Sequence, residues 1–288
     1  MVELVNLICK VRIAFFLFVA LIAVSCDKVS SEADEVVDQD PITGYVNLSE
    51  SSTANCYIVN QGGSYRISAV RGNDASNVLL TAKTAEVMWE SFGSSLSIGA
   101  GALIKSVMYK DGYICFKTND YFKKGNAVVA AKDESGNILW SWHIWITDQP
   151  QEHVYNNDAG TLMDRNLGAT SAEPNIYSVG LMYQWGRKDP FMGPSSFDEN
   201  AEFAKSSITW PAHVASDPST GTVEYAIANP TTFITYNENN KGWYYTSSSQ
   251  MTDISWGWAN SGKAKSIYDP CPAGWRVPDG GQDGVWVK

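Results

Sequence analysis

Aromatic residues interleaved with small polar ones, near the C-terminal end of the chain, are its clearest candidates for chemistry. Flat indole and phenol rings stack on the faces of sugars, while Ser, Thr, Gly and Asn between them supply hydrogen bonds. The sequence therefore predicts a metal-free carbohydrate-binding surface formed by Trp243, Tyr245, Trp256 and Trp258. The alternative, favoured by the commoner use of such rings, is that they fill the core of a loop-rich domain.

Residues for nucleophilic catalysis are sparse. The 3 histidines are His143, His153 and His213, and the chain has neither a Gly-x-Ser-x-Gly elbow nor a His-Glu-x-x-His pair. No glycine-rich loop follows a strand and opens a helix, as a phosphate-binding loop would. We therefore expect a protein that is not an enzyme and binds no nucleotide cofactor.

The tripeptide Glu173-Pro174-Asn175 invites a calcium-dependent sugar site, because such a tripeptide supplies ligands in some C-type lectins. It lies near the start of its region, however, and a companion Trp-Asn-Asp is missing from the sequence. Calcium needs six to eight oxygens from several segments, and no Cys-x-x-Cys pair supports zinc. We expect no metal and no cofactor.

Residues 1–25 have the layout of a lipoprotein signal peptide. Lys10 and Arg12 precede an apolar run, Ile13 to Val24, that is too short to span a bilayer as a helix, for which about 20 residues are needed. Cys26 follows small residues, as in a bacterial lipobox, and is the predicted site of lipidation. An ordinary cleaved signal followed by an incidental cysteine is the alternative.

Residues 26–43 are acidic and contain no aromatic side chain, which predicts a flexible tether between membrane and fold. The whole chain carries a formal charge of −10 and has no cluster of Lys and Arg. Such a chain is a poor partner for nucleic acid, so we expect it to meet the membrane through its N-terminal lipid alone.

Residues 44–148 contain short apolar or alternating runs divided by turn residues, a pattern typical of an Ig-like β-sandwich. Asp111-Gly112 is the strongest hairpin signal, because both residues accept the positive φ angles of a type I′ turn. The predicted strands are 55–60, 64–70, 78–82, 86–91, 104–110, 113–118, 127–131 and 138–147.

The last of these runs is followed by Asp148-Gln149-Pro150, where the composition changes. With the two-residue period of a strand, one face carries Trp140 and Trp142 and is apolar throughout, so these residues are predicted to pack in the core. The opposite face carries His143 and Trp145, which are the candidates for contact with a second domain.

The chain has 5 cysteines, of which Cys9 leaves with the signal and Cys26 carries the lipid. Cys56 and Cys115 lie in strand-like runs, where each is explained as a small buried apolar residue. A bridge between these two remains an alternative if their strands are neighbours, and an odd count leaves at least one free thiol or an intermolecular pair.

Residues 151–288 are richer in glycine, aromatic and loop residues. We expect a short strand near 161–164, a helix at 178–187 from the spacing of its apolar residues, and long loops over 189–240. The predicted architecture is therefore mainly β: a sandwich followed by a loop-rich α+β domain.

The runs TANCYIVNQGGSYRI, VMWES, GYICFKT, GNAVVAAKD and ILWSWHIWITD resemble an Ig-like N-terminal module of surface lipoproteins of Bacteroidetes, many of them fimbrillin-like or fimbrium-tip proteins. The acidic residues after Cys26 likewise resemble the export signal of such lipoproteins. The resemblance implies a lipid-anchored protein of the outer membrane that faces the cell exterior.

The runs MDRNLGAT, GLMYQWGRKDPF and KSIYDPCPAGWRVPD resemble the Fibrobacter succinogenes major paralogous domain, which has a C-type-lectin-like fold. That family continues beyond the last motif, so the resemblance implies a partial, C-type-lectin-like domain at 151–288, with unpaired sheet edges unless another chain completes it.

Together these features lead us to expect a non-enzymatic cell-surface lipoprotein, a fimbrial or adhesin-type subunit whose partners are pilus subunits or a host or glycan ligand. A glycan-binding lipoprotein of an uptake system is the alternative, and a surface hydrolase is a third hypothesis.

Overall fold

The computed structural model describes residues 42–92, 96–97, 101–155, 160–192, 212–236, 242–245, 256 and 265–278. The predicted signal peptide, Cys26, most of the predicted tether and Trp258 lie outside the described residues. All the elements below belong to one compact unit, Pro41–Lys288.

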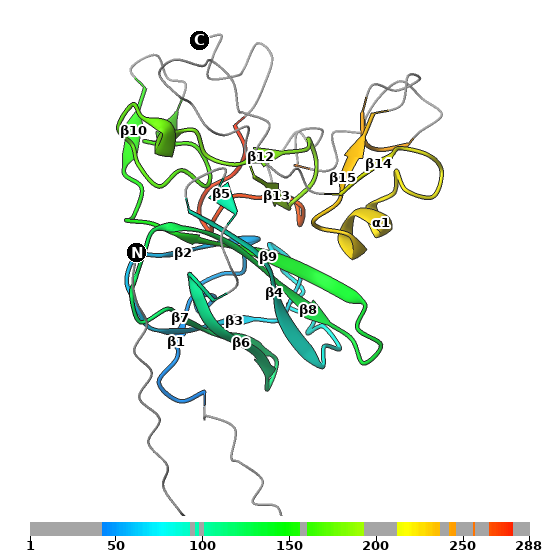
Figure 1. The fold of residues 1–288 in the computed structure, drawn as a ribbon, viewed down its shortest axis with the longest axis horizontal. Helices are drawn as coiled ribbons and strands as arrows, with labels where there is room; N and C mark the ends of the chain where they lie inside the picture. Colours follow the sequence, from blue (N-terminus) through cyan, green and yellow to red (C-terminus); the bar gives the residue numbers. More distant parts are fainter. Residues whose placement is uncertain are drawn as a thin grey trace, which may run out of the picture. The chain divides into compact units, whose positions relative to one another are not determined.

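Two sheets form the part of the chain that ends near Asp148, and Figure 1 shows them as two layers. The order in the first sheet is β1 (Val46–Asn47), β3 (Ser64–Ser68), β7 (Tyr113–Thr118), β6 (Ile104–Lys110). The order in the second is β2 (Cys56–Val59), β9 (Ile138–Ile146), β8 (Gly125–Lys132), β4 (Thr84–Phe92), β5 (Leu96–Ser97). The expectation of a mainly β protein is therefore confirmed.

The core lies between the two sheets and is made by alternate residues of their strands. Trp140 and Trp142 of β9 are fully buried there, as predicted, together with Ile67 of β3 and Phe116 of β7. Burial of a large apolar side chain contributes about 1.5–3 kcal/mol, so the two indoles make β9 the centre of this core.

The hairpin between β6 and β7 has the predicted type I′ turn, with φ of 50° at Asp111 and 83° at Gly112. The bounds of these two strands agree with those expected. The predicted strand at 78–82 is wrong, however, because the structure has only a single bridge there, between Val70 and Leu79. Val78 and Leu79 are exposed, and Leu80 and Ala82 pack against the core without pairing as a strand.

The chain after β9 forms short elements. They are β10 (Glu152–Val154), β11 (Thr161–Met163), the 3₁₀ helix η1 (Ile176–Ser178), β12 (Met182–Tyr183), β13 (Pro190–Phe191), β14 (His213–Ala215), α1 (Val223–Ala228) and β15 (Phe233–Thr235). Three two-stranded sheets pair β10 with β11, β12 with β13, and β14 with β15. The strand expected near 161–164 is thus present as β11.

The helix predicted at 178–187 is wrong. Gly180 has a φ of 77° and Gly186 a φ of 86°, values that interrupt a right-handed helix, and β12 lies between them. The α-helix in the described part of the chain is instead α1, within the predicted loops. Thr222 caps it by accepting a hydrogen bond from the Tyr225 amide.

Cys56 and Cys115 lie in different sheets and are both buried. Their strand neighbours Tyr57, Ile114 and Phe116 point into the core between the sheets, so both thiols are on the outward faces of their sheets. The Cys56–Cys115 bridge is therefore wrong as an alternative, because the whole core separates the two sulfur atoms.

Candidate functional site

The outward face of β9 is covered by the chain that follows it. The Trp145 indole N–H donates to the carbonyl oxygen of Ala169 at 2.9 Å, and the Tyr183 hydroxyl is 3.4 Å from His143 Nδ1. His143 Nε2 is 2.8 Å from Asn126 Oδ1 of β8. The prediction that His143 and Trp145 contact the C-terminal part of the chain is confirmed.

His143 is a structural residue. It is fully buried, and that burial lowers its pKa to about 3, so the imidazole is neutral at pH 7. With one partner on each nitrogen, the neutral ring links β9 to Asn126 of β8 and to Tyr183. It has no open side from which to exchange a proton with a substrate.

Ser141 of β9 contacts the ion pair that Lys188 and Asp189 form in the GRKDPF run. Lys188 Nζ lies 2.6 Å from Asp189 Oδ1 and donates to Ser141 Oγ at 2.5 Å, while that hydroxyl donates to Asp189 Oδ1 at 2.6 Å. A Ser–Lys pair is chemistry of a nucleophile and its base. All three residues are buried, however, so the arrangement fastens residues 188–189 to β9 and leaves no approach for a substrate.

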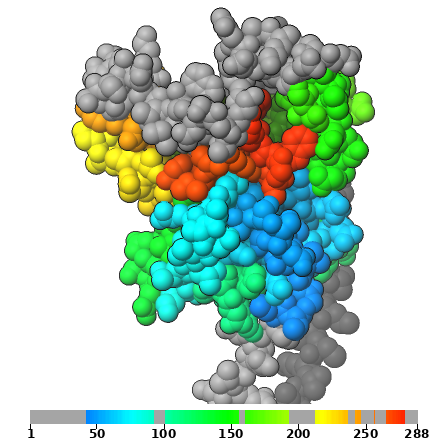
Figure 2. Space-filling model, turned by 180° about the vertical axis from the view of Figure 1, so that it is seen from behind, coloured from blue at the N-terminus to red at the C-terminus, as the bar shows by residue number. Residues whose placement is uncertain are grey.

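The Asp-Pro-Cys-Pro-Ala-Gly-Trp run is held as a loop by its first residue. The carboxylate of Asp269 is fully buried and accepts the backbone N–H groups of Cys271 and Val277, at 2.8 and 2.9 Å. The side chain of Asn55, next to β2, donates to the carbonyl oxygens of Ile267 and Asp269. Figure 2 shows this orange-to-red segment against the blue residues of the sandwich.

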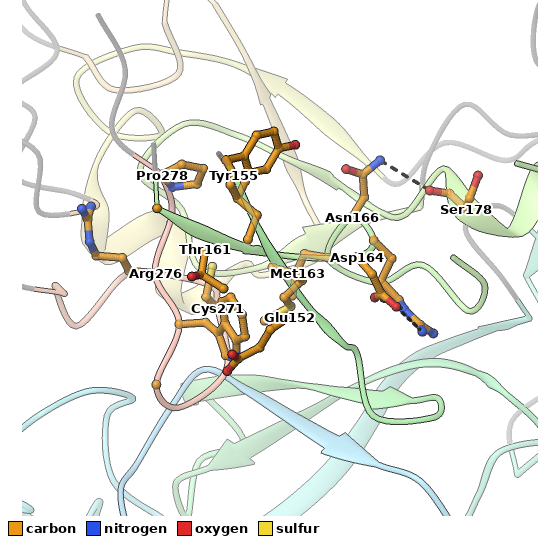
Figure 3. A pocket seen from close by; sticks show the side chains of 16 residues that line it. Glu152, Tyr155, Thr161, Met163, Asp164, Asn166, Ser178, Cys271, Arg276 and Pro278 are labelled. Carbon is orange, nitrogen blue, oxygen red and sulfur yellow. Dashed lines mark hydrogen bonds and ion pairs between the residues drawn. The ribbon is translucent and has the colours of Figure 1, made fainter. Parts of the chain in front are cut away.

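The loop that begins at Asp269 borders a hollow of about 960 Å³. One wall comes from β10, β11 and the Met-Asp-Arg-Asn turn, and the other from residues 271–278, as Figure 3 shows. Its lining includes Glu152, Tyr155, Thr161, Met163, Asn166, Cys271, Trp275 and Arg276. The volume is that of a site for a small molecule or a short oligomer.

Arg165 fixes one end of the hollow. Its guanidinium donates to Asp164 at 2.8 and 3.1 Å and to Asp148 at 3.0 Å, which lowers the pKa of both carboxyl groups. The side chain of Arg165 is only 4% exposed. These bonds tie the turn that carries Asn166 to Asp148, the second residue after β9.

Asn166 itself is exposed, and its amide nitrogen donates to the carbonyl oxygens of Ser178 and Val179 at 3.4 and 3.2 Å. These bonds hold the side chain in place, as the dashed line in Figure 3 indicates. A fixed amide beside carboxylates, a guanidinium and the rings of Tyr155 and Trp275 suits a ligand that presents both hydroxyl groups and flat apolar faces.

The described residues of the predicted aromatic surface have different environments in the structure. Trp243 is 5% exposed and packs with Ala226 and Ile234 in a small core, so it takes the packing role that the sequence left as the alternative. Tyr245 is 38% exposed, and Trp256 is half-buried with its indole N–H donating to the Arg187 carbonyl oxygen at 3.1 Å.

Trp185 joins this group although sequence reasoning missed it. It is 41% exposed, and its ring centroid lies 4.7 Å from that of Trp256. The sequence signal that could have identified Trp185 was the Trp-Gly dipeptide, since Gly186 turns the chain directly after the ring. The hollow was missed as well: its two walls were visible only as separate motifs, with nothing in the sequence to place them together.

No cluster of three or more His, Cys, Asp or Glu in the described ranges has the arrangement of a metal site. Nor does any helix in that part of the chain have the length and apolar character to cross a membrane. No protein family model, no curated protein and no solved structure matches the chain.

Proposed function

We propose that the chain is a non-enzymatic, lipid-anchored surface protein of fimbrial or adhesin type, in which an Ig-like sandwich carries a C-type-lectin-like segment that binds a glycan. The single observation that carries the binding role is the hollow between β10–β11 and residues 271–278. The lipid anchor and the location at the outer face of the outer membrane rest on the sequence.

The strand order supports the Ig-like part of the proposal. In an Ig sandwich, strands A, B, E and D form one sheet and G, F, C and C′ the other. The orders β1-β3-β7-β6 and β9-β8-β4-β5 follow the same succession, and β2 adds a parallel strand beside β9. A rigid sandwich of this kind is a spacer that presents whatever is fixed to its outward face.

The lining supports a saccharide as the ligand. Sugars combine apolar ring faces with dense hydroxyl groups, and the hollow offers aromatic rings beside amide, carboxylate and guanidinium groups. Its volume accommodates two or three sugar rings. A charged or purely apolar ligand would leave part of this mixed lining without a partner.

Binding can be tested with the full chain in detergent on a glycan array, followed by calorimetry with the best oligosaccharide. We expect Asn166→Ala and Trp275→Ala to weaken binding at least about tenfold, the loss of one good hydrogen bond or stacking contact. Tyr121→Ala is the matched control, because Tyr121 is an exposed aromatic residue of the sandwich. Unchanged binding by both hollow variants would contradict the proposed site.

The same assay separates the hollow from the aromatic surface. Trp256→Ala and Trp258→Ala weaken binding only if the ligand stacks on that surface, as the sequence predicts. If binding survives both changes but is lost in Asn166→Ala, the ligand occupies the hollow. The opposite pattern would move the site to Trp185, Tyr245 and Trp256.

A second function, capture of glycans for an uptake system, is favoured by the size of the hollow, which would hold a free oligosaccharide. Immunogold labelling of intact cells distinguishes the two functions: label along or at the tip of pili supports the adhesin, and label on bare outer membrane supports uptake. The anchor is tested separately by metabolic labelling with a palmitate analogue, which should label the parent chain but not Cys26→Ala.

A further inference from the structure

Cys56 and Cys271, far apart in sequence, lie on adjacent backbone segments. Cys56 is the first residue of β2, the edge strand of the second sheet, and it forms a parallel bridge with Pro272. Paired strands are about 4.8 Å apart and successive Cα atoms about 3.8 Å, so the Cα atoms of Cys56 and Cys271 are about 6 Å apart. A disulfide requires about 4.4–6.8 Å.

Several hydrogen bonds hold the two segments at this distance. Asn55, the neighbour of Cys56, donates to the carbonyl oxygens of Ile267 and Asp269 at 2.7 and 2.9 Å. Within the second segment, Lys265 Nζ donates to the carbonyl oxygens of Cys271 and Pro272, both at 2.7 Å, which fixes the loop that carries Cys271. The approach of the two cysteines is therefore fixed by the fold and does not depend on a flexible loop.

The third cysteine of the folded part is not available to either. Cys115 lies on the outward face of the first sheet, across the whole core from Cys56. Cys56, Cys115 and Cys271 are all thiols in this structure, and besides burial, the Cys56 thiol is close enough to Cys271 to raise the pKa of Cys271.

We propose that Cys56 and Cys271 form a disulfide once the protein is exported, covalently fastening the segment that lines the hollow to strand β2. The inference does not rest on the proposed glycan binding. It needs only an oxidising compartment, which the predicted signal peptide supplies.

The bond forms by exchange with an external disulfide donor. One cysteine thiolate attacks a sulfur of the donor, and the second thiolate then displaces the donor from the mixed disulfide. One S–S bond forms in the protein and one breaks in the donor, which leaves with two electrons and takes up the two protons of the protein thiols.

The surroundings of the thiols decide when this occurs. Burial raises the pKa of both thiols, which disfavours the reactive thiolate in the finished fold. The Lys265 ammonium opposes this effect at both sulfur atoms. We therefore expect the exchange to take place while residues 265–273 dock on β2, before water is excluded.

Peptide mapping tests the proposal directly. The full chain is expressed with export and purified without reductant, and its free thiols are alkylated in denaturant before digestion. We expect a linked peptide pair containing Cys56 and Cys271 that separates on reduction, and a single alkylated cysteine in the folded part, Cys115. Alkylation of all three, or a linked pair that includes Cys115, would overturn the proposal.

Cysteine variants provide a second test of the disulfide, and this test does not rely on the correct folding of any single variant. Cys115→Ser should keep the linked pair and lose the alkylated site, whereas Cys56→Ser and Cys271→Ser should each lose the pair. Because the bond closes a very long loop, reductant should lower the Tm of the parent chain by at least about 5 °C. It should leave the Tm of the double variant Cys56→Ala, Cys271→Ala unchanged, and an equal shift in both would count against the disulfide.

Discussion

The Asn55 side chain accepts a hydrogen bond from the Trp140 indole N–H at 3.0 Å while its amide nitrogen donates to two carbonyl oxygens of the 265–278 segment. One buried amide thus provides hydrogen-bond partners both for the indole N–H of the central tryptophan and for backbone carbonyl oxygens of the loop that borders the hollow. The Oδ1 atom also lies close to Gly72, where a Cβ would approach it to 2.0 Å. This position has room and partners for an amide and for little else.

Changing Asn55 to Asp should therefore destabilise the protein severely. The carboxylate keeps an acceptor for Trp140, but its second oxygen would face the carbonyl oxygens of Ile267 and Asp269 with no proton to share. We expect the free energy of unfolding to fall by about 3–5 kcal/mol, measured by urea denaturation with tryptophan fluorescence. Asn60→Asp, an exposed change at the end of β2, should stay within about 0.5 kcal/mol of the parent. Equal effects of the two changes would contradict this role of Asn55.

Glu90 of β4 organises the start of β6 by a similar means. Its buried carboxylate accepts three backbone N–H groups, those of Ala102, Leu103 and Ile104, at 3.1, 3.1 and 2.5 Å. Glu90→Gln replaces one acceptor oxygen with a donor that faces another N–H, so we expect a loss of about 1–3 kcal/mol in unfolding experiments.

Glu86→Gln provides the matched control on the same strand. Glu86 pairs with Lys132, and its side chain is largely solvent-exposed. Its replacement should therefore cost less than about 1 kcal/mol. A larger loss for Glu86→Gln than for Glu90→Gln would show that the backbone contacts of Glu90 contribute little.

The Lys188–Asp189 pair should behave as buried ion pairs do. Lys188→Met alone leaves the Asp189 carboxylate buried with only the Ser141 hydroxyl as a partner, and we expect a loss of about 3–5 kcal/mol. The triple change Ser141→Ala, Lys188→Met, Asp189→Leu removes every member of the cluster and should cost less than the single change. Denaturant titration of both proteins checks the order, and a triple variant less stable than Lys188→Met would refute it.

The sandwich was predictable because its signals are local. Alternation of apolar residues places Trp140 and Trp142 in the core, and Asp111-Gly112 fixes a hairpin whose strands match the expected bounds. The environment of the outward face of β9 could be predicted only in part. Ser141 is polar and suggested a mixed surface, but its partner Lys188 lies 47 residues away, so its burial depends on a contact that periodicity does not encode.

The part after β9 was less predictable for the same reason. Val179 and Met182 have helical spacing, yet Gly180 adopts a positive φ and fits closely against the Leu167 carbonyl oxygen, where a Cβ would approach to 2.7 Å. A tertiary contact therefore overrides the local pattern. The hollow arises likewise from two motifs that each looked self-contained in the sequence.

The ion pairs of Arg165 should make stability depend on pH in a defined direction. Hydrogen bonds from Arg165 lower the pKa of Asp148 and Asp164 below the ordinary value of about 3.9. A carboxyl group whose folded-state pKa is lowered stabilises the fold above its unfolded pKa, and that contribution is lost as the pH falls through the folded pKa. The pairs therefore contribute fully at pH 7 and progressively less below about pH 4.

Arg165→Met should accordingly lower the free energy of unfolding by about 1–3 kcal/mol at pH 7, with the lower half of the range expected because the Asp148 side chain is 51% exposed. The difference from the parent should narrow by pH 3, as urea titrations at both pH values would record. Lys105→Met breaks the exposed Lys105–Asp120 pair and should change stability by less than about 1 kcal/mol at either pH. If the Arg165→Met difference were as large at pH 3 as at pH 7, the lost contribution would be packing of the arginine side chain and not its hydrogen bonds to the two carboxylates.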